Sequence, residues 1–125
     1  MRRRGVLRAL ALAVLCAPVR ARAHAALVRS TPAHRAVLST PPERVELWFS
    51  ERLEPDYARL SVWSAAGTRV DLGDAAVGAD RTRLAVSLPL LGPGTYTVRF
   101  RVLSVDGHVV ESSLVFTIRS ASRAP

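Results

Sequence analysis

The sequence predicts an all-β domain, a seven-stranded antiparallel Greek-key β-barrel or β-sandwich. Three observations predict this class. Apolar and polar residues alternate over several short segments, turn-forming residues recur roughly every eight to twelve positions, and no segment keeps a helical period over several turns. About 100 residues carry these segments, which is typical of a small sandwich or barrel with a single core.

Seven segments are expected to be strands. The alternation is clearest where Val45, Leu47 and Phe49 share one face and Glu46 and Trp48 share the other. The expected strands are 27–30, 45–49, 58–63, 69–72, 84–88, 96–102 and 114–118. Residues 31–42, with three prolines, and residues 73–82 are expected to be loops, and residues 54–57 are expected to form a helical turn.

The first 23 residues have the composition of a signal peptide. Three arginines start the segment, residues 5–17 are mostly apolar, and Ala21 and Ala23 supply small residues before a cut. The apolar run is shorter than the roughly 20 residues that span a bilayer. We expect export to the periplasm or outside the cell with cleavage between Ala23 and His24, although cleavage after Ala21 or an uncleaved anchor are alternatives. The domain would then span residues 24–120, with residues 121–125 as a loose tail.

Most of the net positive charge lies in this segment. The chain has 18 basic and 10 acidic residues, a formal charge of +8. Six of the arginines and none of the acids fall within residues 1–23, so the mature chain keeps twelve basic against ten acidic residues, near +2. We therefore expect no nucleic-acid binding. The mature chain has no Cys and no Met, since Met1 and Cys16 both precede the cut, and so it lacks soft sulfur ligands for Cu(I).

Residues 104–108 read Ser-Val-Asp-Gly-His and are the strongest candidate for a site. In an extended segment, Asp106 and His108 would lie on the same side of the backbone. Such a pair can hold a metal, orient a proton transfer, or do no more than pair internally. A mature N-terminal His24 would add two nitrogen donors, its α-amine and its ring. Three nitrogens and one oxygen suit Cu(II), less well Ni(II), and Zn(II) least because it prefers a tetrahedral set.

Five segments, in order, resemble the CopC-type copper-binding proteins over nearly all of the mature chain. The segments are His24-Ala25-Ala26-Leu27-Val28, Ser30-Thr31-Pro32-Ala33, Val45-Glu46-Leu47-Trp48-Phe49-Ser50-Glu51, Gly92-Pro93-Gly94-Thr95-Tyr96-Thr97-Val98 and Ser104-Val105-Asp106-Gly107-His108. The resemblance implies a cupredoxin-like or immunoglobulin-like β domain in the periplasm. It also implies one Cu(II) ion, bound by His24 through amine and ring, by Asp106 and by His108.

The resemblance further implies that Glu51 accepts a hydrogen bond near the terminal amine. The Met-rich Cu(I) segment of some members is missing from this chain. Because other members are fused to a membrane permease, a CopD-type inner-membrane copper permease is a candidate partner. We expect a mature protein that does not span the membrane and is a monomer.

Three classes of function follow from these observations. The first is a non-enzymatic carrier or buffer of copper, used in copper homeostasis or resistance. The second is a copper-dependent oxidative enzyme with a histidine brace, although a domain of this size has little room for a substrate face. The third is a metal-free structural β-sandwich. His34, in the proline-rich loop, is expected to be a solvated surface residue, with participation in a metal site left open.

Overall fold

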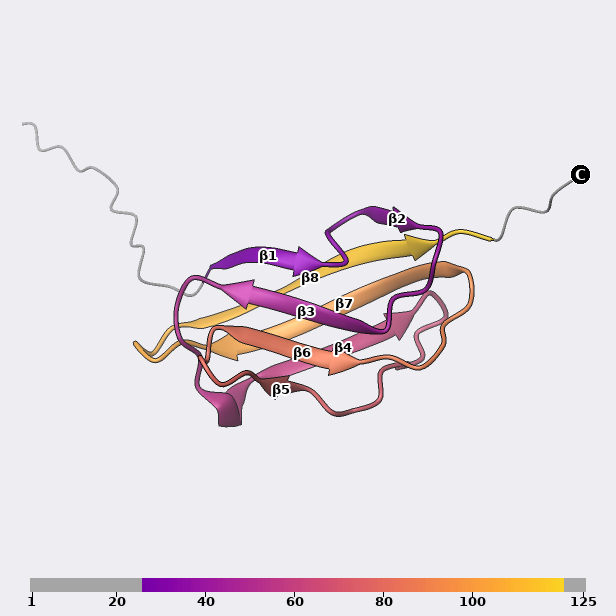
Figure 1. Cartoon of the computed structure of the whole chain (residues 1–125). Coiled ribbons are helices and arrows are strands. Elements are labelled where there is room, and N and C mark those ends of the chain that lie inside the picture. The colour runs from indigo at the N-terminus through magenta and orange to yellow at the C-terminus, as the bar shows by residue number, and fades with distance from the viewer. Residues whose placement is uncertain (1–25, 121–125) are drawn as a thin grey trace, which may run out of the picture.

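Two four-stranded sheets packed face to face make up residues 26–120, the part of the chain described in this computed structural model (Figure 1). The first sheet has the order β1 (Leu27–Thr31), β3 (Arg44–Phe49), β6 (Arg83–Ser87), β5 (Ala76–Val77). The second has the order β2 (Ala36–Leu38), β8 (Val109–Ile118), β7 (Gly94–Leu103), β4 (Arg59–Ser64). The predicted signal peptide and the predicted tail at residues 121–125 lie outside the described residues.

The core lies between the inward faces of the two sheets. Alternate residues of β3, β4, β6, β7 and β8 are buried, as the apolar alternation predicts. Two aromatic pairs lie in this core. The rings of Phe49 and Phe100 meet edge to face across the two sheets at 5.5 Å, and those of Tyr96 and Phe116 stack at 5.4 Å.

The predicted all-β class is confirmed, but the strand count is eight rather than seven. The strands β2 and β5 fall within the two segments expected to be loops. They have only three and two residues, too few for a period to be visible in the sequence. The expectation of a purely antiparallel arrangement is also wrong, because β2 pairs with β8 in parallel, whereas the other described pairings are antiparallel. The expected helical turn is present as a 3₁₀ helix, η1 (Pro55–Tyr57).

Residues 69–72 do not form the expected strand. Arg69 makes a single bridge to Trp63, and the Val70 N–H donates to the Val62 carbonyl at 2.8 Å. The ladder ends there because the Val62 N–H donates to the Asp71 carboxylate, at 2.8 Å, rather than to backbone. The segment then crosses to the first sheet. Trp63 also lies on the second sheet and Trp48 on the first, so the two tryptophans face opposite sides of the sandwich.

Asp71 is a structural carboxylate, and its loss is expected to destabilise the fold. Its side chain is fully buried and accepts hydrogen bonds from Arg69, Val62 and Gly73. Burial alone would raise the pKa of this carboxyl, but the hydrogen bonds from Arg69 and from the two backbone N–H groups hold the pKa below its usual value. We expect Asp71→Ala to lower the free energy of unfolding by about 2 kcal/mol, because the buried Val62 N–H loses its acceptor.

Denaturant unfolding over a range of pH tests this expectation. Because the pKa of Asp71 is lower in the native state, its contribution should be complete above about pH 4 and lost as the pH falls further. Asp71→Ala should therefore flatten the acid side of the stability profile. Asp56→Ala, on the exposed η1, is the matched control and should leave the profile unchanged. Equal profiles for all three proteins would show that Asp71 is not a stabilising carboxylate.

One end of the sandwich gathers three separate parts of the chain. Figure 1 shows the start of β1, the end of β3 and the β7–β8 turn together at its left side, with β2 toward the other end. Leu27 is opposite Phe49 in the first sheet and Leu103 is opposite Val109 in the second. A bridge between Leu53 and Ser104 joins the two sheets at this end. The turn at this end contains Asp106 and His108.

Candidate metal centre

Residues 104–108 form the turn that joins β7 to β8. The Ser104 N–H donates to the His108 carbonyl at 2.9 Å, and the Gly107 N–H donates to the Ser104 carbonyl at 2.8 Å. Gly107 has a φ of 95°, in the left-handed region that favours glycine. The expectation of an extended segment is therefore wrong. Asp106 and His108 come together because the chain turns at Gly107, and not because they alternate along a strand.

Ser104 fixes the turn from inside the core. It is 1% exposed as a whole residue, main chain included, and its hydroxyl therefore lies inside the core. Its hydroxyl donates to Oδ1 of Asp106 and accepts from the His108 N–H at 3.3 Å. Our interpretation of the sequence gave Ser104 no role of its own. The alternation along β7 does indicate a buried position there. Val98, Phe100 and Val102 are buried alternate residues, and Ser104 continues that series with a polar side chain.

Asp106 and His108 form a partly exposed pair. Nδ1 of His108 lies 3.2 Å from Oδ1 of Asp106, and the two side chains are 49% and 33% exposed, respectively. The hydrogen bond from the Ser104 hydroxyl, and then the one from His108, lower the pKa of Asp106 below its usual value. The turn therefore presents a carboxylate that is ionised at neutral pH beside an imidazole, which are an oxygen and a nitrogen donor suited to a transition-metal ion.

The turn packs against residues 50–54, the chain that follows β3. The Val105 N–H donates to the Arg52 carbonyl at 2.9 Å, and Leu53 bridges to Ser104. The same segment holds the first described residue, because Ala26 and Ser50 exchange two hydrogen bonds of 2.8 Å. One short segment thus contacts both the turn and the beginning of the described chain.

The predicted site residues are therefore only partly described. Asp106 and His108 are together, and half-buried Glu51 lies in the segment between Ser50 and Arg52. His24 lies outside the described residues. Within residues 26–120, no three His, Cys, Asp or Glu side chains are grouped as a metal site would require.

His34 belongs to a different part of the molecule. Its Nδ1 accepts a hydrogen bond from the Val115 N–H at 3.2 Å. Val115 is seven residues along the chain from His108, and six of those steps run along β8, so it is roughly 20 Å away at about 3.4 Å per residue. His34 is exposed, as expected, and its ring contacts the β8 backbone instead of the turn.

Comparisons with known proteins identify the family. The CopC domain family matches residues 27–119, and the chain belongs to this family. It is 34% identical over 104 residues to copper resistance protein C of Xanthomonas campestris pv. juglandis, covering 78% of this chain and 81% of that one. It is also 30% identical over 104 residues to copper transport protein CutJ of Bacillus subtilis (strain 168), covering 79% of this chain but only 19% of CutJ.

A solved structure supports the same assignment. The crystal structure of CopC from Methylosinus trichosporium OB3b matches with a TM-score of 0.70 and 33% identity, over 82% of this chain and all of that one. The family is one of copper-related binding and carrier proteins rather than enzymes, and the chain shares this class. In residues 26–120, no helix has the length and hydropathy needed to cross a bilayer.

Proposed function

We propose that this protein is exported and, once mature, binds one Cu(II) ion as a copper carrier or buffer in the periplasm or its equivalent. The proposed donors are the α-amine and ring of His24, the Asp106 carboxylate and the His108 ring, with Glu51 accepting a hydrogen bond from the amine. Membership of the CopC domain family supports the copper function. The oxidation state and the donor set are our inference from the chemistry of an N,N,N,O site.

The observation that carries the proposal is the shared contact of residues 50–54. This segment hydrogen-bonds Val105, next to Asp106, and it also hydrogen-bonds Ala26. His24 is two residues before Ala26, and two residues reach at most about 7 Å. A mature N-terminus at His24 would therefore begin beside the segment on which the turn is packed.

The rest of the proposal concerns processing and partners. Residues 1–23 act as a signal peptide, residues 24–120 form the copper domain and residues 121–125 are a tail. The mature protein is a monomer that exchanges copper with a separate membrane protein, for which a CopD-type permease is the candidate.

Titration of the exported protein with Cu(II) tests the function. We expect uptake of one equivalent, with an electron paramagnetic resonance spectrum that reports three coordinated nitrogens. Mass spectrometry of the same sample should give His24 as the first residue. An absence of stoichiometric uptake by a chain that does begin at His24 would overturn the proposal in favour of a metal-free domain.

The copper affinity is expected to depend steeply on pH. Cu(II) must displace protons from the α-amine, whose usual pKa is about 8, as well as from the imidazole donors. Hydrogen bonds from Ser104 and His108 keep the pKa of Asp106 low, so the carboxylate does not compete for protons in this range. Between about pH 7.5 and 5.5 we expect the affinity to fall at least tenfold more than it does in a protein whose α-amine is blocked by acetylation, because the free amine becomes protonated over this range.

A competition titration with a chelator of known proton affinity, repeated across this range, measures the fall. An equal loss in the free and the acetylated protein would indicate that the amine is not a ligand.

A further inference from the structure

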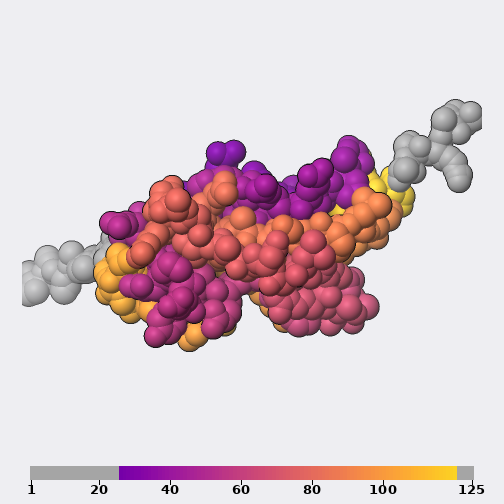
Figure 2. All heavy atoms as spheres, turned by 60° about the horizontal axis from the view of Figure 1, so that its bottom comes forward, coloured from indigo at the N-terminus to yellow at the C-terminus, as the bar shows by residue number. Residues whose placement is uncertain are grey.

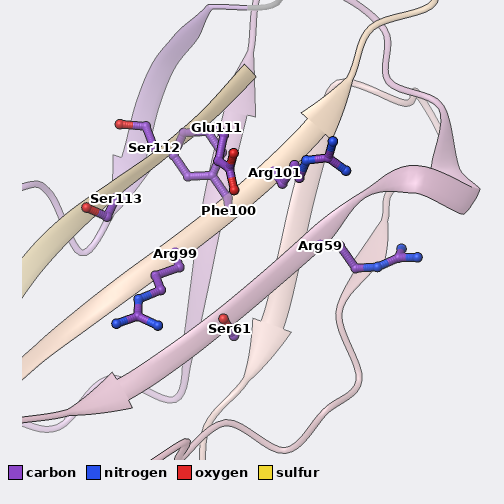
Figure 3. Close-up of a pocket in the computed structure, with 8 residues that line it drawn as sticks. All are labelled: Arg59, Ser61, Arg99, Phe100, Arg101, Glu111, Ser112 and Ser113. Carbon is purple, nitrogen blue, oxygen red and sulfur yellow. The ribbon is translucent and has the colours of Figure 1, made fainter. Parts of the chain in front are cut away.

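The outward face of the second sheet carries a groove toward the end of the molecule that holds the β7–β8 turn. The groove has a volume of about 490 Å³ and lies across β4, β7 and β8 (Figure 3). Two rows of side chains cross it, and within each row the residues are directly opposite one another on neighbouring strands. The first row is Arg59, Arg101 and Glu111, and the second is Ser61, Arg99 and Ser113. We call this surface the arginine groove.

The arginine groove concentrates positive charge, because its three arginines share one acid, Glu111, which is directly opposite Arg101. Arg59 and Arg101 are directly opposite each other on neighbouring strands, and Arg99 is the next outward residue along β7. Like charges in opposed positions destabilise a sheet. Within residues 26–120, the ion pairs involve none of these three guanidinium groups, and Glu111 is the only acid in the groove. With three arginines to one acid, the groove keeps a net positive charge that an external anion would offset.

Two of the three arginines are held in place by contacts that leave their charge intact. The Arg59 guanidinium donates from Nη1 to the carbonyls of Asp56, at 3.1 Å, and Ala58, at 2.9 Å. The Arg99 guanidinium lies 4.9 Å from the centroid of the Trp63 ring. Restrained guanidinium groups lose less conformational entropy when they bind a carboxylate, and their paired N–H donors match its two oxygens.

The hollow surface extends from the arginine groove in two directions. Arg101 also lines a smaller cavity with Tyr57 and Val109, which are 58% and 53% exposed. Val109 directly follows His108 in the sequence, so this cavity lies at the β8 side of the β7–β8 turn. On the other side, Arg59 and Ser61 line an indentation between η1 and the lobe of residues 65–75, visible between the magenta and pink lobes in Figure 2. The three hollows share lining residues, Arg101 on one side and Arg59 and Ser61 on the other, and so form a continuous, elongated surface.

We propose that the arginine groove docks an acidic, extended segment of a partner protein. Its carboxylates pair with Arg59, Arg99 and Arg101, and the serine hydroxyls hydrogen-bond the segment between them. A polypeptide fits better than a bilayer, because the charge lies in a depression, whereas lipid phosphates form a flat plane. The further step, that this partner exchanges copper at the adjacent turn, rests on the proposed function.

Binding of a short fluorescein-labelled peptide of alternating aspartate and serine to the exported chain tests the docking. The matched probe replaces each aspartate with asparagine. We expect the acidic peptide to bind at least tenfold more tightly by fluorescence anisotropy, with affinity falling as salt rises. In a Trp48→Phe background, where Trp63 is the one remaining tryptophan, binding should shift the emission, because Arg99 lies over that ring.

The double variant Arg59→Gln/Arg101→Gln should bind the acidic peptide with at least tenfold lower affinity. It should fold normally, because both side chains are exposed and the lost contacts are offset by removal of the repulsion between the opposed charges. Arg119→Gln, an exposed arginine just past β8, is the matched control and should bind within twofold of the parent. Cu(II) stoichiometry should be unchanged in both variants, so failure of docking and failure of copper binding give different results.

Three outcomes would overturn the proposal. The aspartate and asparagine peptides could bind equally, Arg119→Gln could lose as much affinity as the double variant, or the acidic peptide could fail to bind. Cosedimentation with phosphatidylglycerol vesicles that is lost in the double variant, without peptide binding, would assign the arginine groove to a membrane surface instead.

Discussion

Acetylation of the mature N-terminus is expected to weaken Cu(II) binding by about a thousandfold, or about 4 kcal/mol. In the proposed site, the amine and ring of His24 close a chelate on one ion, and acetylation removes the amine donor while leaving the ring in place. Changes outside the donor set already lower metal affinity by about 10- to 100-fold, so the loss of a donor should exceed that range. A glycine placed before His24 tests the same requirement by moving the amine one residue away.

Competition against a copper chelator measures the change, with the N-terminus of each sample verified by mass spectrometry. The matched control adds the same glycine after Pro125, where it should leave the affinity unchanged. The acetylated protein should also lose one coordinated nitrogen from its electron paramagnetic resonance spectrum. An acetylated protein that keeps the parent affinity would exclude the amine as a ligand and leave a site built from side chains alone.

Periodicity predicts the long strands well because burial imposes it. In β3, β6 and β7 one face contacts the opposite sheet, so alternate residues must be apolar and the pattern is visible in the sequence. The short strands β2 and β5 have no such constraint. Strand β2 exists because residues 36–38 lie beside the end of β8, a parallel contact between distant parts of the chain that no local pattern specifies.

In the site too, the sequence predicts contacts between neighbouring residues better than contacts between distant segments. The spacing of Asp106 and His108 indicated the pair, and a single turn brings them together. The turn that brings the two side chains together was not predictable from alternation, because it depends on the left-handed conformation of Gly107 and on the Ser104 hydroxyl at a core position. The neighbourhood of Ala26 and residues 50–54 depends on the pairing of β1 with β3, which resemblance to a family implies but periodicity does not.

The two described histidines allow a direct test of which ring binds copper. His108→Ala should weaken Cu(II) binding by at least a hundredfold, because it removes a proposed donor and the hydrogen bond that the ring makes with Asp106. His34→Ala should leave the affinity within about twofold, because its Nδ1 accepts a hydrogen bond from β8 roughly 20 Å from the turn. It should instead lower the free energy of unfolding by about 1 kcal/mol, since the Val115 N–H loses its acceptor.

The two readouts separate a ligand from a structural histidine. Copper competition and denaturant unfolding of the same three proteins should give opposite rankings, with His108→Ala weakest in copper binding and His34→Ala the less stable of the two variants. Because His108 is half exposed and lies in a turn, its loss should leave the two sheets intact. Equal copper affinity for His108→Ala and the parent would contradict the proposed donor set, even if the protein still bound one ion.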